Sequence, residues 1–338
     1  MEQRTLGRTG RTISVIGLGT WQLGADWGDV SEADAAAVLD ASHAAGVTFF
    51  DTADVYGDGR SETIIGGWRA RLSEADRARV TVATKMGRRQ DQLLENYSAA
   101  NFRAWSDRSR ANLQMDTLDL VQLHCPPSDV YESDAVFDAL DALVADGSIA
   151  AYGVSVETVE QALSAIARPH LSSVQIILNA FRLKPLDAVL PAAMGAGVGI
   201  IARVPLASGL LSGRYRHDTG RYRHDTAFAA NDHRAYNRHG EAFDVGETFS
   251  GVDFDEGVEA AREFSALAEA AGLQPATAAL AWLAQLPGVS AVIPGARNVA
   301  QAEGNAAAGS VDLLGDGFTT SVRELYDRRF RAAIHARW

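Results

Sequence analysis

Residues 47–57 read VTFFDTADVYG, a β-branched and aromatic run that leads into polar side chains. Two further runs follow the same plan, VTVATKMG at residues 80–87 and LDLVQLHCP at residues 118–126. Each has the length and composition of a buried strand. Each also carries a chemically capable side chain at its carboxyl end, where a (β/α) barrel assembles its active site. These three stretches therefore predict a barrel.

The side chains at the ends of these runs form a set suited to proton transfer. Asp51 and Tyr56 belong to the first run, Lys85 to the second and His124 to the third. A single Asp or Lys at a strand end is more often part of a surface ion pair. A carboxylate, a phenol, an amine and an imidazole at matching strand ends favour an active site that holds and moves a proton.

The same alternation of strand and helix extends along most of the chain. We expect strands at residues 14–19, 47–52, 80–85, 117–123, 149–154, 173–179, 198–203 and 289–293. We expect helices at residues 31–45, 61–71, 98–113, 134–145, 156–167, 187–196, 256–271, 276–285 and 298–308. Strands separated by helices imply parallel pairing with right-handed crossovers. Eight such units in about 300 residues predict an α/β fold, a closed (β/α)8 TIM barrel.

The domain organisation follows from the absence of a linker rich in Pro, Gly or Ser. We expect residues 1–338 to form a single domain, with a core over about residues 4–308. Residues 309–338 read as a C-terminal extension, a loop and a helix packed on the exterior of the barrel.

One connection breaks the regular spacing. Residues 204–255 form a loop after strand 7 that is far longer than the usual 2–6 residues. In a barrel this loop lies on the face of the active site, so we expect it to cover a ligand. The hexamer RYRHDT occurs in it twice, at residues 214–219 and 221–226, and we interpret the second copy as a tolerated duplication.

Composition limits the classes of partner and compartment. The net charge of −12 argues against nucleic acid or an anionic membrane surface as a partner, although a local basic pocket can still bind an anionic cofactor. The single cysteine, Cys125, excludes an intramolecular disulfide and fits a reducing compartment. The first residues lack the apolar core of a signal peptide, and we expect no membrane span and a cytoplasmic protein. The sequence leaves the oligomeric state open.

Five motifs, taken in order, resemble the aldo-keto reductase family. They are GLGTW at residues 17–21, DTADVYG at 51–57, Lys85 after TVAT, His124 in QLH, and IPGARNVAQAEGN at 293–305. Each motif alone is weak, but their order and spacing extend the resemblance over residues 4 to about 308.

The four polar residues have a chemical interpretation that agrees with the roles implied by the resemblance. Reduction of a carbonyl by hydride needs an acid for the developing alkoxide, and Tyr56 is the candidate. A free phenol titrates near pKa ≈ 10, and we expect Lys85 to lower this pKa. Asp51 can hold the ammonium group of Lys85. His124 can donate a hydrogen bond to the substrate oxygen, worth about 2.7–4 kcal/mol in comparable sites.

The resemblance also implies that the cofactor is NADPH/NADP+. The family's phosphate loop follows strand 7, where small residues let backbone amides approach a pyrophosphate. The start of the helix at 298–308 favours an anion, and Arg297 can contact a 2′-phosphate through two N–H groups. The cofactor candidates in these two segments are Pro205, Leu206, Ser208, Gly209, Leu211, Arg214, Gly295, Arg297, Gln301 and Asn305. The sequence has no GxGxxG motif in a strand–turn–helix context, so a Rossmann domain is not expected.

Around the expected nicotinamide the chain departs from the common family pattern. Many members carry Ser-Asn at the end of strand five to hold the carboxamide, whereas this chain has Ser155-Val156. Gln175, the third usual partner, is present. Arg203 stands where an aromatic ring often stacks on the nicotinamide, and a guanidinium plane can also stack on a ring.

The expected substrate pocket is formed by Trp21, Trp27, Met86 and the long loop. Trp27 can equally pack on the surface, and for Met86 simple packing is the favoured alternative. The loop histidines have spacings that match no zinc pattern, so we expect no metal. They are His217, His224, His233 and His239.

The function predicted from these residues is NADPH-dependent reduction of an aldehyde or ketone to an alcohol, with a small carbonyl compound as substrate. Two alternatives remain: an NADP-linked sugar or alcohol dehydrogenase or dehydratase, and a cofactor-sensing subunit without catalysis. A glycoside hydrolase is disfavoured because the site lacks paired carboxylates.

Overall fold

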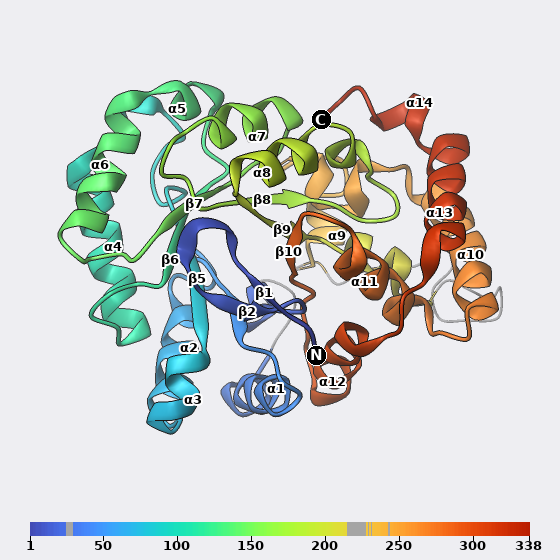
Figure 1. Cartoon of the computed structure of the whole chain (residues 1–338), viewed down its shortest axis with the longest axis horizontal. Helices are drawn as coiled ribbons and strands as arrows, with labels where there is room; N and C mark the ends of the chain where they lie inside the picture. The colour runs from blue at the N-terminus through green and yellow to red at the C-terminus, as the bar shows by residue number, and fades with distance from the viewer. Residues whose placement is uncertain (25–29, 215–227, 229, 231, 243) are drawn as a thin grey trace.

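The computed structural model describes residues 1–24, 30–214, 228, 230, 232–242 and 244–338. Eight parallel strands pair in the order in which they occur along the chain, each with its sequence neighbour (Figure 1). They are β3 (Leu18–Gly19), β4 (Phe49–Asp51), β5 (Thr81–Met86), β6 (Leu120–His124), β7 (Tyr152–Ser155), β8 (Ser173–Ile177), β9 (Gly199–Arg203) and β10 (Val289–Val292). Parallel bridges from Ile16 to Val292 and from Gly19 to Gly295 join the first strand to the last. The predicted (β/α)8 barrel is confirmed.

Helices cover the outside of the strands, as Figure 1 shows. The α-helices of the barrel are α1 (Glu32–Ala44), α2 (Arg60–Ala70), α3 (Glu74–Arg79), α4 (Ala99–Leu113), α5 (Ser128–Glu132), α6 (Asp134–Ala145), α7 (Val159–Ile166), α8 (Val189–Ala196), α9 (His233–Tyr236), α10 (Phe254–Ala270), α11 (Pro275–Gln285) and α12 (Val299–Ala307). The short 3₁₀ helices are η1 (Gly7–Thr9), η2 (Trp21–Gly24), η3 (Leu94–Asn96), η4 (Lys184–Leu186), η5 (Ala207–Ser212), η6 (Val245–Glu247), η7 (Phe249–Gly251) and η8 (Ala308–Ser310).

The prediction of one continuous strand over residues 14–19 is wrong. Ser14 ends strand β2 (Thr12–Ser14), which pairs antiparallel with β1 (Gln3–Thr5), and only Leu18–Gly19 forms the barrel strand β3. The hairpin places Leu6 and Ile13 in one buried cluster with apolar side chains from the barrel strands. Burial of these two side chains explains why the chain turns into a hairpin before it enters the barrel.

The pleat of the strands sorts side chains between the barrel interior and the helices. Successive side chains of a strand point to opposite faces. Phe49, Ala83 and Leu120 belong to the same small cluster as the hairpin residues, whereas Phe50 and Val82 belong to the larger core that includes helix residues. The barrel therefore has an inner and an outer apolar layer.

The C-terminal extension lies outside the barrel, as predicted. It contains α13 (Gly315–Arg329) and α14 (Arg331–Ile334), and α13 runs beside α10 in Figure 1. The carboxylate of Glu263 on α10 accepts hydrogen bonds from Arg328 and Arg329. The assignment of all 338 residues to a single domain stays a prediction.

The long connection after β9 is not irregular throughout. It contains η5, α9, η6 and η7, and α10 already begins at Phe254. Except for Arg214, both copies of RYRHDT lie outside the described residues, as do His217 and His224. Within the described parts of the chain, no helix is both long and apolar enough to cross a membrane.

Candidate active site

The four predicted catalytic side chains lie together at the carboxyl ends of β4, β5 and β6. The Lys85 ammonium donates to Asp51 Oδ1 at 2.5 Å and to the Thr52 carbonyl at 2.8 Å. Its Nζ lies 3.5 Å from the hydroxyl of Tyr56. The ring of His124 stands edge-on to that of Tyr56, with 6.0 Å between the ring centroids. One cation thus links a carboxylate to a phenol.

Two glutamines hold the other oxygen of the carboxylate. The amide nitrogens of Gln122 and Gln175 donate to Asp51 Oδ2 at 3.1 and 2.7 Å. Gln175 was expected to contact the cofactor, and its amide nitrogen is engaged by Asp51 and by Gln122. The sequence analysis missed Gln122, although it lies two residues before His124 on one strand and therefore on the same face.

Burial dominates the protonation of the phenol. It raises the pKa of Tyr56 above its ordinary value, and the charge of Lys85 offsets only part of this increase. Lys85 thus lowers the pKa of Tyr56 as expected, but the expected net decrease is wrong because burial outweighs the charge of Lys85. Burial lowers the pKa of Lys85, but Asp51 and Tyr56 outweigh it, so that the pKa of Lys85 rises. Both groups remain protonated at neutral pH.

The imidazole of His124 is neutral at pH 7. Burial, followed by the charges of Arg88, Lys85 and Arg203, holds the pKa of His124 well below its ordinary value. A neutral imidazole has one N–H donor. The Nδ1 atom of His124 is buried and has no hydrogen-bond partner among the described residues.

An aromatic wall borders the catalytic side chains. The ring of Trp21 in η2 lies nearly parallel to that of Tyr56, 6.0 Å away and at 19°. His233 from α9 packs against Trp21 at 5.2 Å. Trp27, the other predicted tryptophan, lies outside the described residues.

Met86 does not belong to this wall, contrary to the prediction. It is buried, and its sulfur contacts the hydroxyl of Ser106 on α4. Because Lys85 points into the barrel, the next side chain on the strand must point outward. The packing alternative for Met86 is the one that the structure supports.

A cavity of about 990 Å³ extends from these side chains toward β9 and α12. Asp51, Tyr56, His124 and Trp21 line it, and Lys85 is buried behind them. The predicted cofactor residues that line it are Ser155, Gln175, Arg203, Pro205, Leu206, Ser208, Gly209, Arg214, Gly295, Arg297, Gln301 and Asn305. Leu211 does not line the cavity, because its side chain is buried in the apolar core, and its predicted contact with the cofactor stays a prediction.

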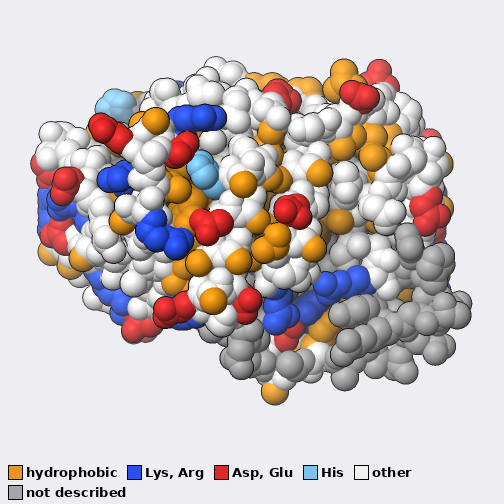
Figure 2. Space-filling model, turned by 90° about the horizontal axis from the view of Figure 1, so that it is seen from below, with side chains coloured by type: hydrophobic (Ala, Val, Ile, Leu, Met, Phe, Trp, Pro, Cys, Tyr) orange, Lys and Arg blue, Asp and Glu red, His pale blue; other side chains and the backbone are white. Residues whose placement is uncertain are grey.

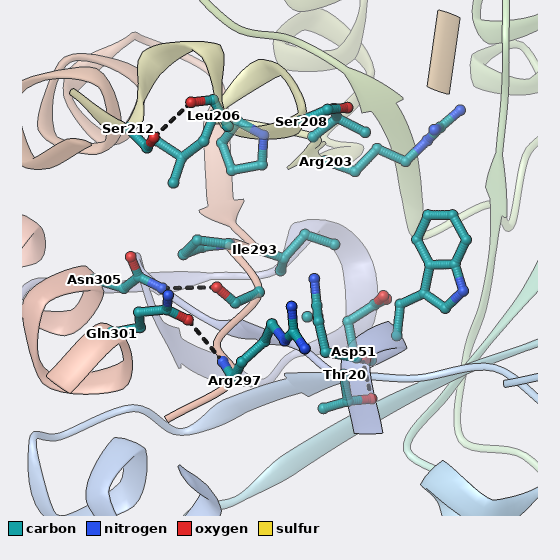
Figure 3. Close-up of a pocket in the computed structure, with 18 of the residues that line it drawn as sticks. Thr20, Asp51, Arg203, Leu206, Ser208, Ser212, Ile293, Arg297, Gln301 and Asn305 are labelled. Atoms are coloured by element: carbon teal, nitrogen blue, oxygen red, sulfur yellow. Dashed lines mark hydrogen bonds between the residues drawn. The ribbon is translucent and has the colours of Figure 1, made fainter. Parts of the chain in front are cut away.

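Two walls of the cavity face each other in Figure 3, which shows Leu206, Ser208 and Ser212 on one side and Arg297, Gln301 and Asn305 on the other. On the first wall, Ser208 and Gly209 both have positive φ, 53° and 100°. These conformations turn the backbone tightly along the cavity wall, and the amide of Gly209 donates to the carbonyl of Leu206 at 2.9 Å.

On the second wall the polar side chains shape the turn before α12. The backbone amide of Arg297 donates to the side chain of Gln301 at 2.8 Å. Asn305 donates to the carbonyl of Gly295 at 3.1 Å. The side chain of Arg297 is left at the exposed edge of the cavity, next to a helix N-terminus, where an anion is favoured.

A second ionic cluster lies beside the catalytic one. Arg203 forms a buried ion pair with Glu247 of η6, and Arg88 pairs with Glu157 at 3.2 Å. Arg88 also donates to the carbonyl of His124 at 3.1 Å. Only Arg203 was predicted to belong to the site. Glu247 was missed because nothing in the sequence pattern links a residue of a long loop to a strand end, whereas Arg88 and Glu157 each lie two residues after a strand end and were missed despite that signal.

The same cluster contains a group of possible metal ligands. The side chains of Cys125, Glu157 and Glu247 offer ligand atoms within 4.8 Å of one another. Both carboxylates already pair with arginines, so the charge that would attract a cation is neutralised. The expectation of no metal stays a prediction.

Charge on the surface is mixed rather than of one sign. Figure 2 shows acidic and basic side chains interspersed over one face of the molecule.

A further arginine missed by the sequence analysis, Arg234, lines the cavity and donates to both oxygens of Asp232.

Comparisons with known proteins agree with this fold. The profile of the Aldo/keto reductase family matches residues 15–327. An uncharacterized oxidoreductase of Mycobacterium tuberculosis is 33% identical over 325 residues, which cover 92% of this chain and 90% of that protein.

Two solved structures share the fold over nearly the full length. The glycerol dehydrogenase of Gluconobacter oxydans superposes with a TM-score of 0.77 at 26% identity and covers 97% of this chain and 96% of its own. An aldo-keto reductase of Klebsiella pneumoniae in complex with NADPH has a TM-score of 0.69 at 24% identity and covers 96% of each chain. Because the family profile matches most of the length of this chain, the chain belongs to the aldo/keto reductase family.

Proposed function

We propose that this protein reduces an aldehyde or ketone to an alcohol with NADPH and that Tyr56 is the general acid. The observation that carries the proposal is the position of Lys85, whose ammonium lies between the carboxylate of Asp51 and the hydroxyl of Tyr56. This arrangement stands at one end of a cavity whose other end offers anion-binding backbone and Arg297.

The residues present fit a dinucleotide phosphate. The cavity volume of about 990 Å³ is at the upper end of the range for cofactor sites. The loop after β9, whose small residues Ser208, Gly209 and Ser212 line the cavity, would hold the pyrophosphate, and Arg297 the 2′-phosphate. When bound, NADPH would supply a hydride to the carbonyl carbon. The Klebsiella neighbour in complex with NADPH supports this choice of cofactor.

Tyr56 and Lys85 manage the proton. Because its pKa is raised by burial, Tyr56 keeps its proton at neutral pH until an alkoxide forms beside it. The phenolate left after proton transfer would be stabilised by the ammonium of Lys85. Asp51, held in turn by Gln122 and Gln175, keeps this ammonium in position.

His124 would orient the substrate. Because its imidazole is neutral, it can donate one hydrogen bond to the carbonyl oxygen without competing for the proton of Tyr56. A donor aimed at a developing oxyanion contributes about 2.7–4 kcal/mol in comparable sites. Trp21 would cover one side of the substrate.

The first test removes the hydroxyl of Tyr56. With a panel of aldehydes and ketones, wild-type protein should consume NADPH, measured as loss of its absorbance. Tyr56→Phe should lose about 10²–10⁴-fold in kcat and keep its affinity for NADPH.

Tyr152→Phe is the matched control, because that hydroxyl donates to Asp141 and does not line the cavity. Unchanged turnover in Tyr56→Phe would show that Tyr56 is not the acid.

A second candidate is oxidation of an alcohol by the same residues in reverse. The similarity to a glycerol dehydrogenase favours it, since that neighbour has the higher TM-score and identity of the two structures described above. Assays with NADP+ and polyols, run beside the reductive assays, distinguish the two directions. Cytoplasmic localisation, the dehydratase and the cofactor-sensing subunit stay predictions.

A further inference from the structure

Arg203 is a buried cation at the chemical end of the cavity. It is the last residue of β9, and 7% of its surface is exposed. Burial lowers the pKa of Arg203, but the neighbouring groups, first among them Glu247, raise this pKa by more than burial lowers it. The guanidinium therefore keeps its charge. Its Nε atom is buried without a hydrogen-bond partner among the described residues.

The contacts of Arg203 connect two departures from the common family pattern. One terminal nitrogen donates to the carbonyl of Val156 at 3.0 Å, and the other pairs with Glu247. The two residues that depart from the expected pattern are thus in direct contact, since the backbone of Val156 provides a partner for the side chain of Arg203. The loop then supplies the carboxylate that balances the charge.

The hydride-donating ring must lie close to this pair. Transfer requires contact with the carbon whose oxygen faces Tyr56. Arg203 and Glu247 line the cavity together with Tyr56 (Figure 3 shows Arg203 across the gap from Asp51). In addition, Glu247 is close enough to Tyr56 to raise the pKa of Tyr56, and Tyr56 is close enough to Arg203 to raise the pKa of Arg203.

The two forms of the cofactor differ in charge at this ring. The reduced nicotinamide is neutral, whereas the oxidised ring carries one positive charge. An unbalanced guanidinium nearby repels the oxidised form, and an unbalanced carboxylate attracts it. In a poorly solvated site one such charge changes a binding constant by about tenfold or more.

We infer that the Arg203–Glu247 ion pair sets the preference of the site between reduced and oxidised cofactor, and that Glu247 moderates the repulsion of NADP+ by Arg203. This inference rests on the proposed function, because it presupposes that the cavity binds NADP(H). Glu247 acts through Arg203 and is a positioning residue, one that determines which form of the cofactor binds more tightly.

A structural role alone predicts a different result. Glu247 also ties the loop to the barrel, since its carbonyl accepts a hydrogen bond from Ser208 at 3.1 Å. If the ion pair only anchors the loop, its loss weakens NADPH and NADP+ equally. The ratio of the two dissociation constants separates the two roles.

The experiment measures the Kd of NADPH and of NADP+ by isothermal titration calorimetry. In Glu247→Gln the ratio Kd(NADP+)/Kd(NADPH) should rise about tenfold, and in Arg203→Met it should fall by a similar factor. The double variant should return to the wild-type ratio. Glu247→Asp, which keeps the negative charge, should also show the wild-type ratio.

Glu263→Gln is the matched control, because it breaks an ion pair of the same kind between α10 and α13, away from the cavity. If Arg203→Met does not fold, the comparison of Glu247→Gln with Glu247→Asp still decides. Equal changes for both cofactor forms in Glu247→Gln would overturn the inference alone. Failure of wild-type protein to bind either form would overturn the proposed function as well.

Discussion

At one end of the cavity the functional side chains come from strand ends and are buried, whereas at the other end they come from a loop and a helix start. Asp51, Lys85 and His124 are at most 8% exposed, and the ammonium of Lys85 donates to Asp51. Arg297 is exposed, and its neighbourhood is shaped by backbone contacts of Gln301 and Asn305. The first end can stabilise charge without screening by water, and the second can bind and release an anion.

The comparison predicts that losses at the buried end affect chemistry far more than binding. Lys85→Met should reduce kcat by about 10³-fold or more, because a phenolate at Tyr56 would then form without a counter-ion. The Kd of NADPH should stay close to that of the wild type. Steady-state kinetics and calorimetry measure the two quantities.

Lys184, the other lysine of the chain, provides the control, since it pairs with Glu160 on the surface. The variant Lys85→Met leaves Asp51 without its cation in the interior, which costs about 3–5 kcal/mol in comparable sites, so thermal unfolding must be recorded beside activity. A folded Lys85→Met with wild-type kcat would remove the distinction between the two ends.

A substitution at the exposed end should do the opposite. Arg297→Leu should weaken NADPH about tenfold or more and leave NADH unchanged, because only NADPH carries the 2′-phosphate. The effect should shrink at high ionic strength, as expected of an exposed charge. Calorimetry with both cofactors at two salt concentrations measures it.

Arg323→Leu, an exposed arginine on α13, serves as the control for that experiment. Equal weakening of NADH and NADPH in Arg297→Leu would place the 2′-phosphate elsewhere. A loss in kcat alone would show that the two ends are not separate in function.

The last prediction concerns stability rather than activity or cofactor binding, and it rests on a carboxylate behind the buried end. Both oxygens of Asp54 are buried without a hydrogen-bond partner among the described residues. Burial, and next the charge of Glu62, raise the pKa of Asp54 to about 7, against the opposing charges of Arg89 and Arg108. Because the folded-state pKa is the higher one, the folded protein is most favoured below the unfolded pKa near 3.8 and loses this contribution as pH rises toward 7.

Wild-type stability should therefore fall between pH 4 and pH 7 by at most about 1.4 kcal/mol per pH unit from this group. Asp54→Asn should flatten that slope, as measured by denaturant unfolding at a series of pH values. Asp138→Asn, an exposed change on α6 away from this loop, is the control. Parallel slopes for wild type and Asp54→Asn would show that Asp54 is not the group that titrates.

Prediction from the sequence succeeded where a local pattern carries the information. The apolar runs located every barrel strand except the first, because strand composition and a polar carboxyl end are properties of adjacent residues. The four catalytic candidates were found in the same way. The error at residues 14–19 arose because the strand break depends on the burial of Leu6 and Ile13 among side chains from distant strands.

Errors at single residues had a similar cause. Met86 was assigned to the pocket although the pleat that points Lys85 inward must point Met86 outward. Gln122 was missed although the same rule places it beside His124. Glu247 could not be found by any local rule, because a long loop places it against Arg203 across 43 intervening residues.

The sequence by itself determined the barrel and indicated the catalytic candidates and the two candidate cofactor segments, since each of these signals is carried by residues a few positions apart. Only the tertiary structure decided which charges meet: Glu247 with Arg203, Glu157 with Arg88, and the two glutamines with Asp51. The physical reason is that buried ion pairs and hydrogen bonds form between groups brought close by packing. Their energies depend on distance and exclusion of water, which no local pattern encodes.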